Sequence, residues 1–241
     1  MTPRISVIVP TRQRTHLLAP MLLSVMSTAQ ERVEIVMRVD VDDDESIAYL
    51  RMSPFPFPFI VGPRYNGYAT LGMLINEAAR MSRGELVLVV NDDVEFCTRG
   101  WDTKLLALAA QYPDGIFNIG VQVENADNFV FPCISRTLVH VLDGVFDERL
   151  VYPDIGLRDV LRAFNRAVRT EEVVIKHNWM GMTPDQQNAV GHTQTGTYHN
   201  LYALCVQEGI EKIKQHLRRS TCVVHSTDFG STDFASVGVA K

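Results

Sequence analysis

The chain has 241 residues and a formal net charge of −5, from 23 Lys and Arg against 28 Asp and Glu. This length fits one large α/β domain, and the negative charge argues against a tight binder of duplex DNA. The apolar runs are far shorter than the roughly 20 residues that span a bilayer, and the amino terminus lacks the layout of a signal peptide. Four cysteines without paired or zinc-like spacing predict reduced thiols in a cytoplasmic protein: Cys97, Cys133, Cys205 and Cys222.

Strand and helix patterns alternate over the first hundred residues. Short β-branched or apolar runs indicate strands, and apolar side chains at helical spacing indicate amphipathic helices. The expected strands are 5–9, 34–41, 59–61 and 86–90, and the expected helices are 16–28 and 70–83. The prolines of residues 53–59 predict an extended linker. This alternation predicts a mostly parallel sheet with helices on both faces.

The order is looser in the second half of the chain. The expected elements are a helix at 101–112, strands at 116–123 and 129–134, a helix at 155–167, a strand at 172–176 and a helix at 201–217. Residues 183–199 are polar and rich in Gly, Gln, Asn and Thr, so we expect a mobile loop there. The tail after Phe229 is expected to be frayed.

Two adjacent acids end the apolar run Leu-Val-Leu-Val-Val that begins at Leu86. Asp92 and Asp93 stand where open α/β sheets place their ligands, at the carboxyl end of a buried strand. Adjacent carboxylates repel each other unless a cation or hydrogen-bond donors offset the charge, and a divalent ion that carries a phosphate is a natural partner. The alternative is a solvated Asn-Asp-Asp turn or helix cap.

The order and spacing of several motifs resemble the family 2 glycosyltransferases of the GT-A fold, over roughly residues 5–180. The motifs are Val7-Ile-Val-Pro-Thr11 with Arg14, then Asn76, Gly84 and Asn91-Asp92-Asp93, then Gly144-Val-Phe-Asp147-Glu148 with Asp154. Three departures stand out. Asn91-Asp92-Asp93 replaces the usual Asp-x-Asp, Pro153-Asp154 replaces the usual Glu-Asp, and the second strand ends in so many acids that Asp40 or Asp42 could be the residue that contacts the base.

The resemblance implies a single GT-A domain over residues 1–241. Residues 1–100 would bind the nucleotide sugar, and residues 101–241 would form the acceptor half. The donor would be a nucleoside diphosphate sugar, with UDP favoured, and the donor-binding residues would be Pro10, Thr11, Arg14, Asp40, Asn76 and Asp92. Asp40 is favoured over Asp42 for the base, with a strand-end cap as its alternative role.

The resemblance also implies a metal site and a catalytic base. Asp93 and His177 would hold Mn2+ or Mg2+, and the imidazole favours Mn2+. For His177 the alternative is a structural role. Asp154 would take the proton of the acceptor hydroxyl, with Asp159 in reserve, although an Asp just before a helix is also a good amino-terminal cap.

The expected activity is an inverting, metal-dependent glycosyl transfer. The acceptor is open: a glycan, a lipid-linked sugar, a protein or a modified nucleic-acid base would all fit. Two rival functions remain, a sugar nucleotidyltransferase and a catalytically inactive binding module of the same fold. The first would usually have a glycine-rich loop after the first strand, whereas residues 10–14 contain basic residues and no glycine.

Overall fold

The computed structural model describes residues 2–54, 57–124, 131–178 and 184–227, so the tail after Phe229 lies outside the described residues. The elements follow in this order: β1 (Ile5–Thr11), α1 (Thr15–Thr28), β2 (Val33–Asp40), α2 (Asp44–Met52), β3 (Phe59–Gly62), the 3-10 helix η1 (Gly67–Thr70), α3 (Leu71–Met81), β4 (Leu86–Val89), β5 (Val94–Phe96), α4 (Trp101–Ala109), β6 (Asn118–Val123), β7 (Pro132–Ser135), α5 (Arg136–Leu142), α6 (Pro153–Arg162), β8 (Ala167–His177), α7 (Pro184–His192) and α8 (Gly196–Thr227).

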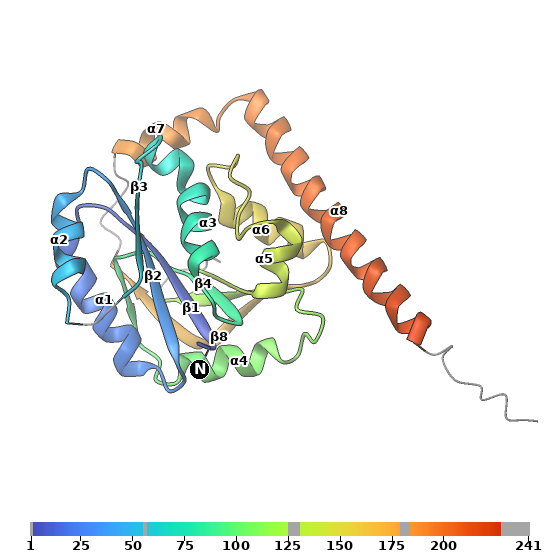
Figure 1. Cartoon of the computed structure of the whole chain (residues 1–241). Helices are drawn as coiled ribbons and strands as arrows, with labels where there is room; N and C mark the ends of the chain where they lie inside the picture. Colours follow the sequence, from blue (N-terminus) through green and yellow to red (C-terminus); the bar gives the residue numbers. More distant parts are fainter. Residues whose placement is uncertain (1, 55–56, 125–130, 179–183, 228–241) are drawn as a thin grey trace, which may run out of the picture.

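The strands of the described residues form one sheet in the order β3-β2-β1-β4-β7-β6-β8-β5. β3, β2, β1 and β4 are mutually parallel. β7 is antiparallel to both of its neighbours, and β8 is parallel to β6 but antiparallel to β5. The expected α/β class with a mostly parallel sheet is confirmed, and β1 lies inside the sheet between β2 and β4 (Figure 1).

The alternating side chains of β1 explain why helices cover both faces of the sheet. Val7 and Val9 belong to an apolar cluster with α1, α2 and α4, whereas Ile8 belongs to a second cluster with α3, α5, α6 and α8. Each fully buried aliphatic side chain stabilises the fold by about 1.5 to 3 kcal/mol. Both faces of β1 are therefore core, as the unbroken apolar run predicts.

Gly84 joins α3 to β4 where the chain passes very close to β1. A Cβ at this position would lie 2.5 Å from both the backbone nitrogen and Oγ of Ser6. The backbone nitrogen of Gly84 instead donates a hydrogen bond of 2.7 Å to that Oγ. Only glycine leaves room for this contact, which fixes where β4 begins beside β1.

Short helices and one boundary differ from the sequence-based expectation. α2 and α5 were not expected, because each is too short to show a clear helical spacing of apolar residues, with Ile47 and Leu50 buried in α2. The helix expected at 155–167 ends at Arg162, and Ala167 already belongs to β8. Asn165, with a left-handed φ of 55°, makes the turn between them, and pairing with β6 outweighs helical spacing in the residues that follow.

The prediction of a loop at 183–199 is wrong, because most of this segment is helical. Residues 184–192 form α7, α8 begins at Gly196, and residue 183 lies outside the described residues. The proline with which α7 begins does not prevent the helix, because the backbone N–H groups of a first helical turn have no partner within the helix. α7 has few apolar positions, and Ala189 is its one residue described as buried, so hydrophobic spacing did not predict this helix.

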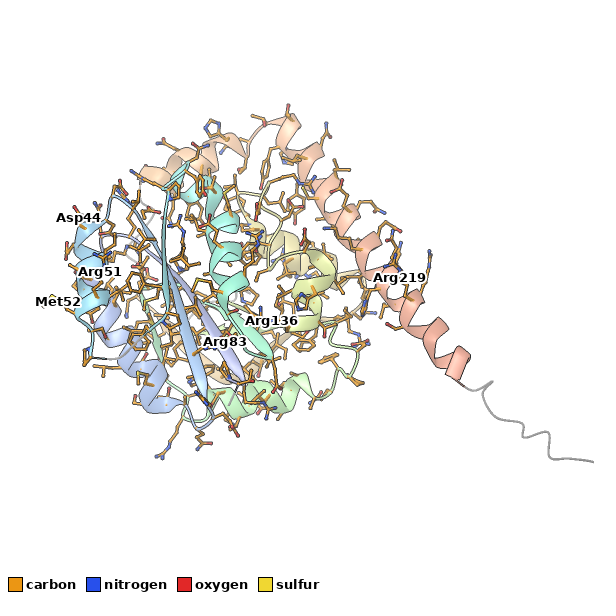
Figure 2. All side chains as sticks on the ribbon, in the orientation of Figure 1. Asp44, Arg51, Met52, Arg83, Arg136 and Arg219 are labelled. Atoms are coloured by element: carbon orange, nitrogen blue, oxygen red, sulfur yellow. The ribbon has the colours of Figure 1, made fainter. Side chains whose placement is uncertain are left out.

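α8 is the longest helix and crosses α5 and α6 before it runs on beyond the sheet (Figure 1). Arg219 lies exposed on this outer part, just as Asp44, Arg51 and Met52 lie on the outer side of α2 (Figure 2). Within the described residues, none of the helices combines the length and the apolar character needed to cross a membrane.

Asn76 does not contact the predicted site but holds the loop that precedes α6. Its Nδ2 donates to the carbonyl of Phe146 at 2.8 Å and to Glu148 at 3.0 Å. Its Oδ1 accepts from the backbone nitrogens of Val145 at 2.8 Å and Phe146 at 3.1 Å. A Cβ on Gly144 would lie 2.7 Å from Nδ2. The carboxamide is fully used inside the protein, which corrects its expected role as a donor contact.

We predict that Asn76→Ala destabilises the fold by about 2 to 3 kcal/mol, because it leaves buried backbone groups of residues 145 and 146 without partners. Urea unfolding of the variant and the wild type measures this loss. Asn66→Ala is the control: Asn66 is exposed and its side chain caps no helix end, so its loss should stay within about 0.5 kcal/mol. Equal effects of the two changes would contradict the role given to Asn76.

Candidate active site

One cleft at the carboxyl ends of β1, β2 and β4 gathers every predicted site residue except Asn76. Its lining includes Pro10, Thr11, Arg14, Asp40, Asp92, Asp93, Asp154 and His177. The cleft has a volume of about 680 Å³, within the range of about 300 to 1,000 Å³ for small-molecule sites. The strand order reverses here, because the chain runs outward from β1 through β2 to β3 and then returns to β4 on the other side of β1. Open α/β folds usually bind their ligands at such a point. Asn76 instead lines a smaller, separate cavity of about 340 Å³ that is also lined by residues of α8.

The adjacent acids after β4 are both buried and are held by the turn that follows β1. Oδ2 of Asp92 accepts a hydrogen bond of 2.8 Å from Thr11. Nη1 of Arg14 lies 3.0 Å from Oδ1 of Asp92 and 3.2 Å from Oδ2 of Asp93. These partners come from β1 and from the residue before α1, so the parallel pairing of β1 with β4 creates the contact. A solvated turn at residues 91–93 is thereby excluded.

The two acids have pKa values that move in opposite directions. Burial raises the pKa of Asp92 above its ordinary value, and the charge of Asp93 adds to it, although Arg14 and Thr11 work against the change. Burial also acts to raise the pKa of Asp93, but His177 and Arg14 outweigh it and leave that pKa lowered. Asp93 is therefore the acid of the pair that stays ionised most firmly.

Asp93 and His177 lie close enough together to share one cation. Oδ1 of Asp93 is buried, lies 3.0 Å from Nε2 of His177, and has no hydrogen-bond donor other than the one this nitrogen would provide when it carries a proton. Nε2 also lies 3.4 Å from the amide nitrogen of Asn91, which would donate to its lone pair. Two lone pairs at this distance repel unless a proton or a cation lies between them. An ion bound here would need further ligands, because no cluster of three or more His, Cys, Asp or Glu in the described part of the chain is placed to hold one.

Strand pairing brings His177 to this position. β5 begins at Val94, directly after the acids, and pairs with β8 so that Val94 faces His177. The backbone nitrogen of Asn178 also donates to the carbonyl of Asp93 at 2.8 Å. The ring of Phe131 meets the imidazole edge-on with centroids 5.3 Å apart. The histidine predicted for the metal site is thus fixed beside Asp93.

Two arginines hold Asp40 at the end of β2. Nη1 of Arg12 lies 3.1 Å from Oδ2 of Asp40, and Nη1 of Arg38 lies 3.3 Å from Oδ1. Burial raises the pKa of Asp40 even though both arginines lower it. Asp42 is exposed and pairs with Arg12 at 2.5 Å, and Asp43 is buried and accepts from the first turn of α2. The structure thus places Asp40, and not Asp42, in the cleft lining, as expected.

Asp154 enters the cleft from the first turn of α6. Pro153 occupies the first turn as well, and the hydroxyl of Tyr198 from α8 accepts from the backbone nitrogens of Val151 at 3.2 Å and Tyr152 at 3.4 Å. Burial raises the pKa of Asp154, although backbone hydrogen bonds at the helix start oppose the change. Tyr152, and not Asp154, occupies the N-cap position of α6, although the Asp154 carboxylate accepts from backbone nitrogens of the first turn.

Asp159, the reserve candidate for the base, is engaged elsewhere. It accepts a hydrogen bond of 2.6 Å from Tyr202 of α8 and pairs with Arg158 and Arg162. It does not belong to the cleft lining. Its contacts join α6 to α8, so the structure favours Asp154 for a role in the cleft.

Several cleft residues were missed from the sequence. They are Arg12, Arg38, Arg64, Tyr68 and Gln186. The sequence did contain a signal for Arg38: a charged residue inside an apolar strand needs a polar partner once it is buried. The structure confirms the burial, with Arg38 1% exposed. The sequence contained no such signal for Tyr68. In the structure, burial, together with Asp154 and Tyr152, raises the pKa of Tyr68 to about 12.

Comparisons with known proteins agree with this geometry. A family model described as "Glycosyl transferase family 2" matches residues 6–166. A mannosyltransferase from Pyrobaculum calidifontis, solved with GDP-Man and Mn2+, has a TM-score of 0.62 at 14% identity, over 96% of this chain and 77% of that one. S. aureus TarS 1-349, solved with UDP, has a TM-score of 0.57 at 16% identity, over 86% of this chain and 70% of that one.

A curated relative is more similar in sequence but much longer. It carries the name "Uncharacterized protein y4gI", comes from Sinorhizobium fredii and is 30% identical over 130 residues. The match covers 47% of this chain and 14% of the relative, so it concerns a small part of that protein. The solved structures, at their low identity, support the fold.

The raised pKa of Asp154 predicts a specific pH dependence of stability. The folded protein keeps the proton of Asp154 above the unfolded pKa of about 3.9, so wild-type stability falls as pH rises from that value through the folded pKa. Asp154→Asn cannot ionise and should lose this decline. Relative to wild type, its free energy of unfolding in urea should increase between about pH 4 and about pH 8. A difference that stays constant over this range would contradict the prediction.

Proposed function

The chain belongs to glycosyl transferase family 2, and we propose that it moves a sugar from a nucleoside diphosphate sugar to an acceptor hydroxyl, with inversion at the anomeric carbon. The observation that carries the proposal is the meeting of Asp40, the Asp92–Asp93 pair, His177 and Asp154 in one cleft. These groups provide what the reaction needs: a nucleoside site, a site for the charge of the leaving group and a base.

The donor occupies the part of the cleft near β1, β2 and β4. Asp40 accepts a hydrogen bond from the base edge, Asp92 faces the ribose, and Pro10, Thr11 and Arg14 line the path of the diphosphate. The guanidinium of Arg14 suits phosphate oxygens because it can donate two parallel hydrogen bonds. We favour a UDP sugar. Solved structures of TarS contain UDP and UDP-GlcNAc, and the similar mannosyltransferase contains GDP-Man, so GDP is the alternative.

Asp93 and His177 are the residues that would hold a divalent ion, Mn2+ or Mg2+. The carboxylate suits either ion, and the imidazole nitrogen favours Mn2+. When bound, such an ion stabilises the charge that develops on the departing diphosphate. The two protein ligands leave room for diphosphate oxygens and water to complete the shell.

Asp154 is the proposed base. The acceptor oxygen forms a bond to the anomeric carbon while the bond from that carbon to the diphosphate breaks, and its electron pair leaves with the diphosphate. Asp154 takes the proton of the acceptor hydroxyl in the same step. Its raised pKa makes it a stronger base than an exposed aspartate, and neither Asp92 nor Asp93 is among the groups that shift this pKa.

A panel of nucleotides tests the proposal and its rivals. Thermal unfolding with UDP, GDP and their sugars, with and without Mn2+, identifies the donor, and release of free UDP or GDP from the sugar nucleotide reports turnover. An inactive binding module would be stabilised by nucleotide without releasing it. A nucleotidyltransferase would make the sugar nucleotide from a nucleoside triphosphate. Glycans, lipid-linked sugars, proteins and modified bases are the acceptor classes to supply.

We predict that Asp93→Ala abolishes the metal-dependent part of the stabilisation by UDP. In the wild type, UDP with Mn2+ at a hundredfold excess over its Kd should stabilise the fold by about 2.7 kcal/mol. The variant loses the carboxylate that holds the ion, so Mn2+ should add nothing to the effect of UDP. His177→Ala should lower the increment less, since one carboxylate and the diphosphate still hold the ion. An unchanged increment in Asp93→Ala would refute the metal assignment.

We predict that Asp154→Asn lowers glycosyl transfer by about 100-fold or more, because the amide cannot take the proton. Binding of donor, measured by thermal shift, should stay close to wild type. Asp159→Asn is the matched control on the same helix and should retain most of the transfer activity. Loss of transfer in Asp159→Asn, with normal transfer in Asp154→Asn, would move the base to the second residue.

A further inference from the structure

Arg14 occupies the space between the two acids that a cation would be expected to fill. One nitrogen, Nη1, lies 3.0 Å from Oδ1 of Asp92 and 3.2 Å from Oδ2 of Asp93. The second oxygen of each acid has another neighbour, Thr11 for Asp92 and His177 for Asp93. A guanidinium therefore offsets part of the negative charge of the acid pair in the nucleotide-free protein.

The backbone of Arg14 is anchored while its side chain reaches solvent. Gln13, with a left-handed φ of 53°, donates its backbone N–H to Asp43 at 2.7 Å, and Asp43 in turn accepts from the first turn of α2. The Arg14 side chain is 31% exposed, whereas those of Asp92 and Asp93 are 6% exposed. The side chain can therefore leave the acids without any change in the turn that carries it.

The neighbouring Arg12 shows that this placement is particular to Arg14. Arg12 comes from the same turn, but its guanidinium pairs with Asp40 at 3.1 Å and with Asp42 through two nitrogens. In the part of the chain that the structure describes, Arg12 forms no ion pair with Asp92 or Asp93. The turn after β1 thus carries two arginines with different partners, and only the second faces the acid pair.

We propose that Arg14 is an internal counter-cation that keeps the affinity of the site for divalent metal low until a nucleoside diphosphate binds. The inference rests on the proposed function and deepens it. A divalent ion at Oδ1 of Asp93 in the free protein is repelled by the positive guanidinium that contacts Oδ2 of the same carboxylate. A diphosphate offers Arg14 oxygens of matching geometry, so the guanidinium transfers to the phosphates and the carboxylate oxygen becomes available.

This exchange couples the two ligands. Because the coupling free energy is reciprocal, nucleotide raises the affinity for metal by the same factor by which metal raises the affinity for nucleotide. The free protein is then protected from binding a metal ion without its donor. Arg14 acts as a positioning residue in this scheme, since it determines when the metal ligands are free.

The test measures each ligand alone in Arg14→Gln and in the wild type. Mn2+ is titrated into nucleotide-free protein, and the free ion is followed by its paramagnetic resonance signal. UDP, or GDP where UDP does not bind, is titrated by calorimetry in the presence of EDTA. We expect Arg14→Gln to bind Mn2+ about tenfold tighter, because the competing charge is gone. We expect it to bind metal-free nucleotide about tenfold weaker, because a charged hydrogen-bond donor to phosphate is lost.

Opposite shifts of the two affinities are the signature of the counter-cation. Arg12→Gln is the matched control and should leave the affinity for Mn2+ alone at the wild-type value. Unchanged or weaker Mn2+ binding in Arg14→Gln would overturn the inference while the proposed function stands. A wild-type protein that binds neither UDP nor GDP, with or without Mn2+, would overturn the proposed function and this inference together.

A second comparison guards against loss of folding in Arg14→Gln, which leaves two buried acids without their cation. Asp92→Asn is compared with the double variant Asp92→Asn, Arg14→Gln, in which Asp93 is the remaining acid of the pair. Removal of Arg14 should again tighten Mn2+ binding about tenfold. Equal Mn2+ affinities in this pair would overturn the inference.

Discussion

The burial of two adjacent carboxylates is the constraint on which the rest of the site depends. Asp92 and Asp93 are 4% and 5% exposed, and two buried like charges in sequence are costly unless they are compensated. The compensation comes from three separate places: Thr11 at the end of β1, Arg14 before α1 and His177 at the end of β8. The strand order is what brings these groups within reach of the pair. Any ligand that adds positive charge here has to share the two acids with Arg14.

Much of this arrangement follows from local sequence, and the rest depends on tertiary contacts. The apolar runs of β1, β2 and β4 and the acids that end them were predictable, because parallel strands place their carboxyl ends at one edge. The contact of Arg14 with Asp92 joins residues 78 positions apart, so no local pattern reports it. Asn76 shows the converse: its place in α3 was predictable, but its partners at residues 145–148 are some 70 positions away, and the carboxamide turned out to hold that loop.

Four helices were harder to predict for a physical reason. α7 and the start of α8 have few apolar residues, and α2 and α5 are short, so hydrophobic periodicity is weak in all of them. Their helices depend on tertiary contacts: α7 packs beside η1, and Tyr198 of α8 accepts from the backbone before α6. Residues 183–199 are polar, and Gln186 of α7 lines the cleft. A helix that has solvent on one face and a polar cleft on the other contains few apolar residues, so composition alone does not distinguish it from a loop.

The acids of the cleft have pKa values that differ because their surroundings differ. The pKa of Asp93 is lowered because His177 and Arg14 outweigh its burial, which suits a group that has to remain charged beside a cation. The pKa of Asp154 is raised because burial outweighs the helix start, which suits a group that has to accept a proton. Environments that drive the pKa values of neighbouring acids apart are the usual way in which one fold assigns different roles to the same side chain. In the proposed function, the burial that makes Asp154 less stable as an anion is also what makes it the stronger base.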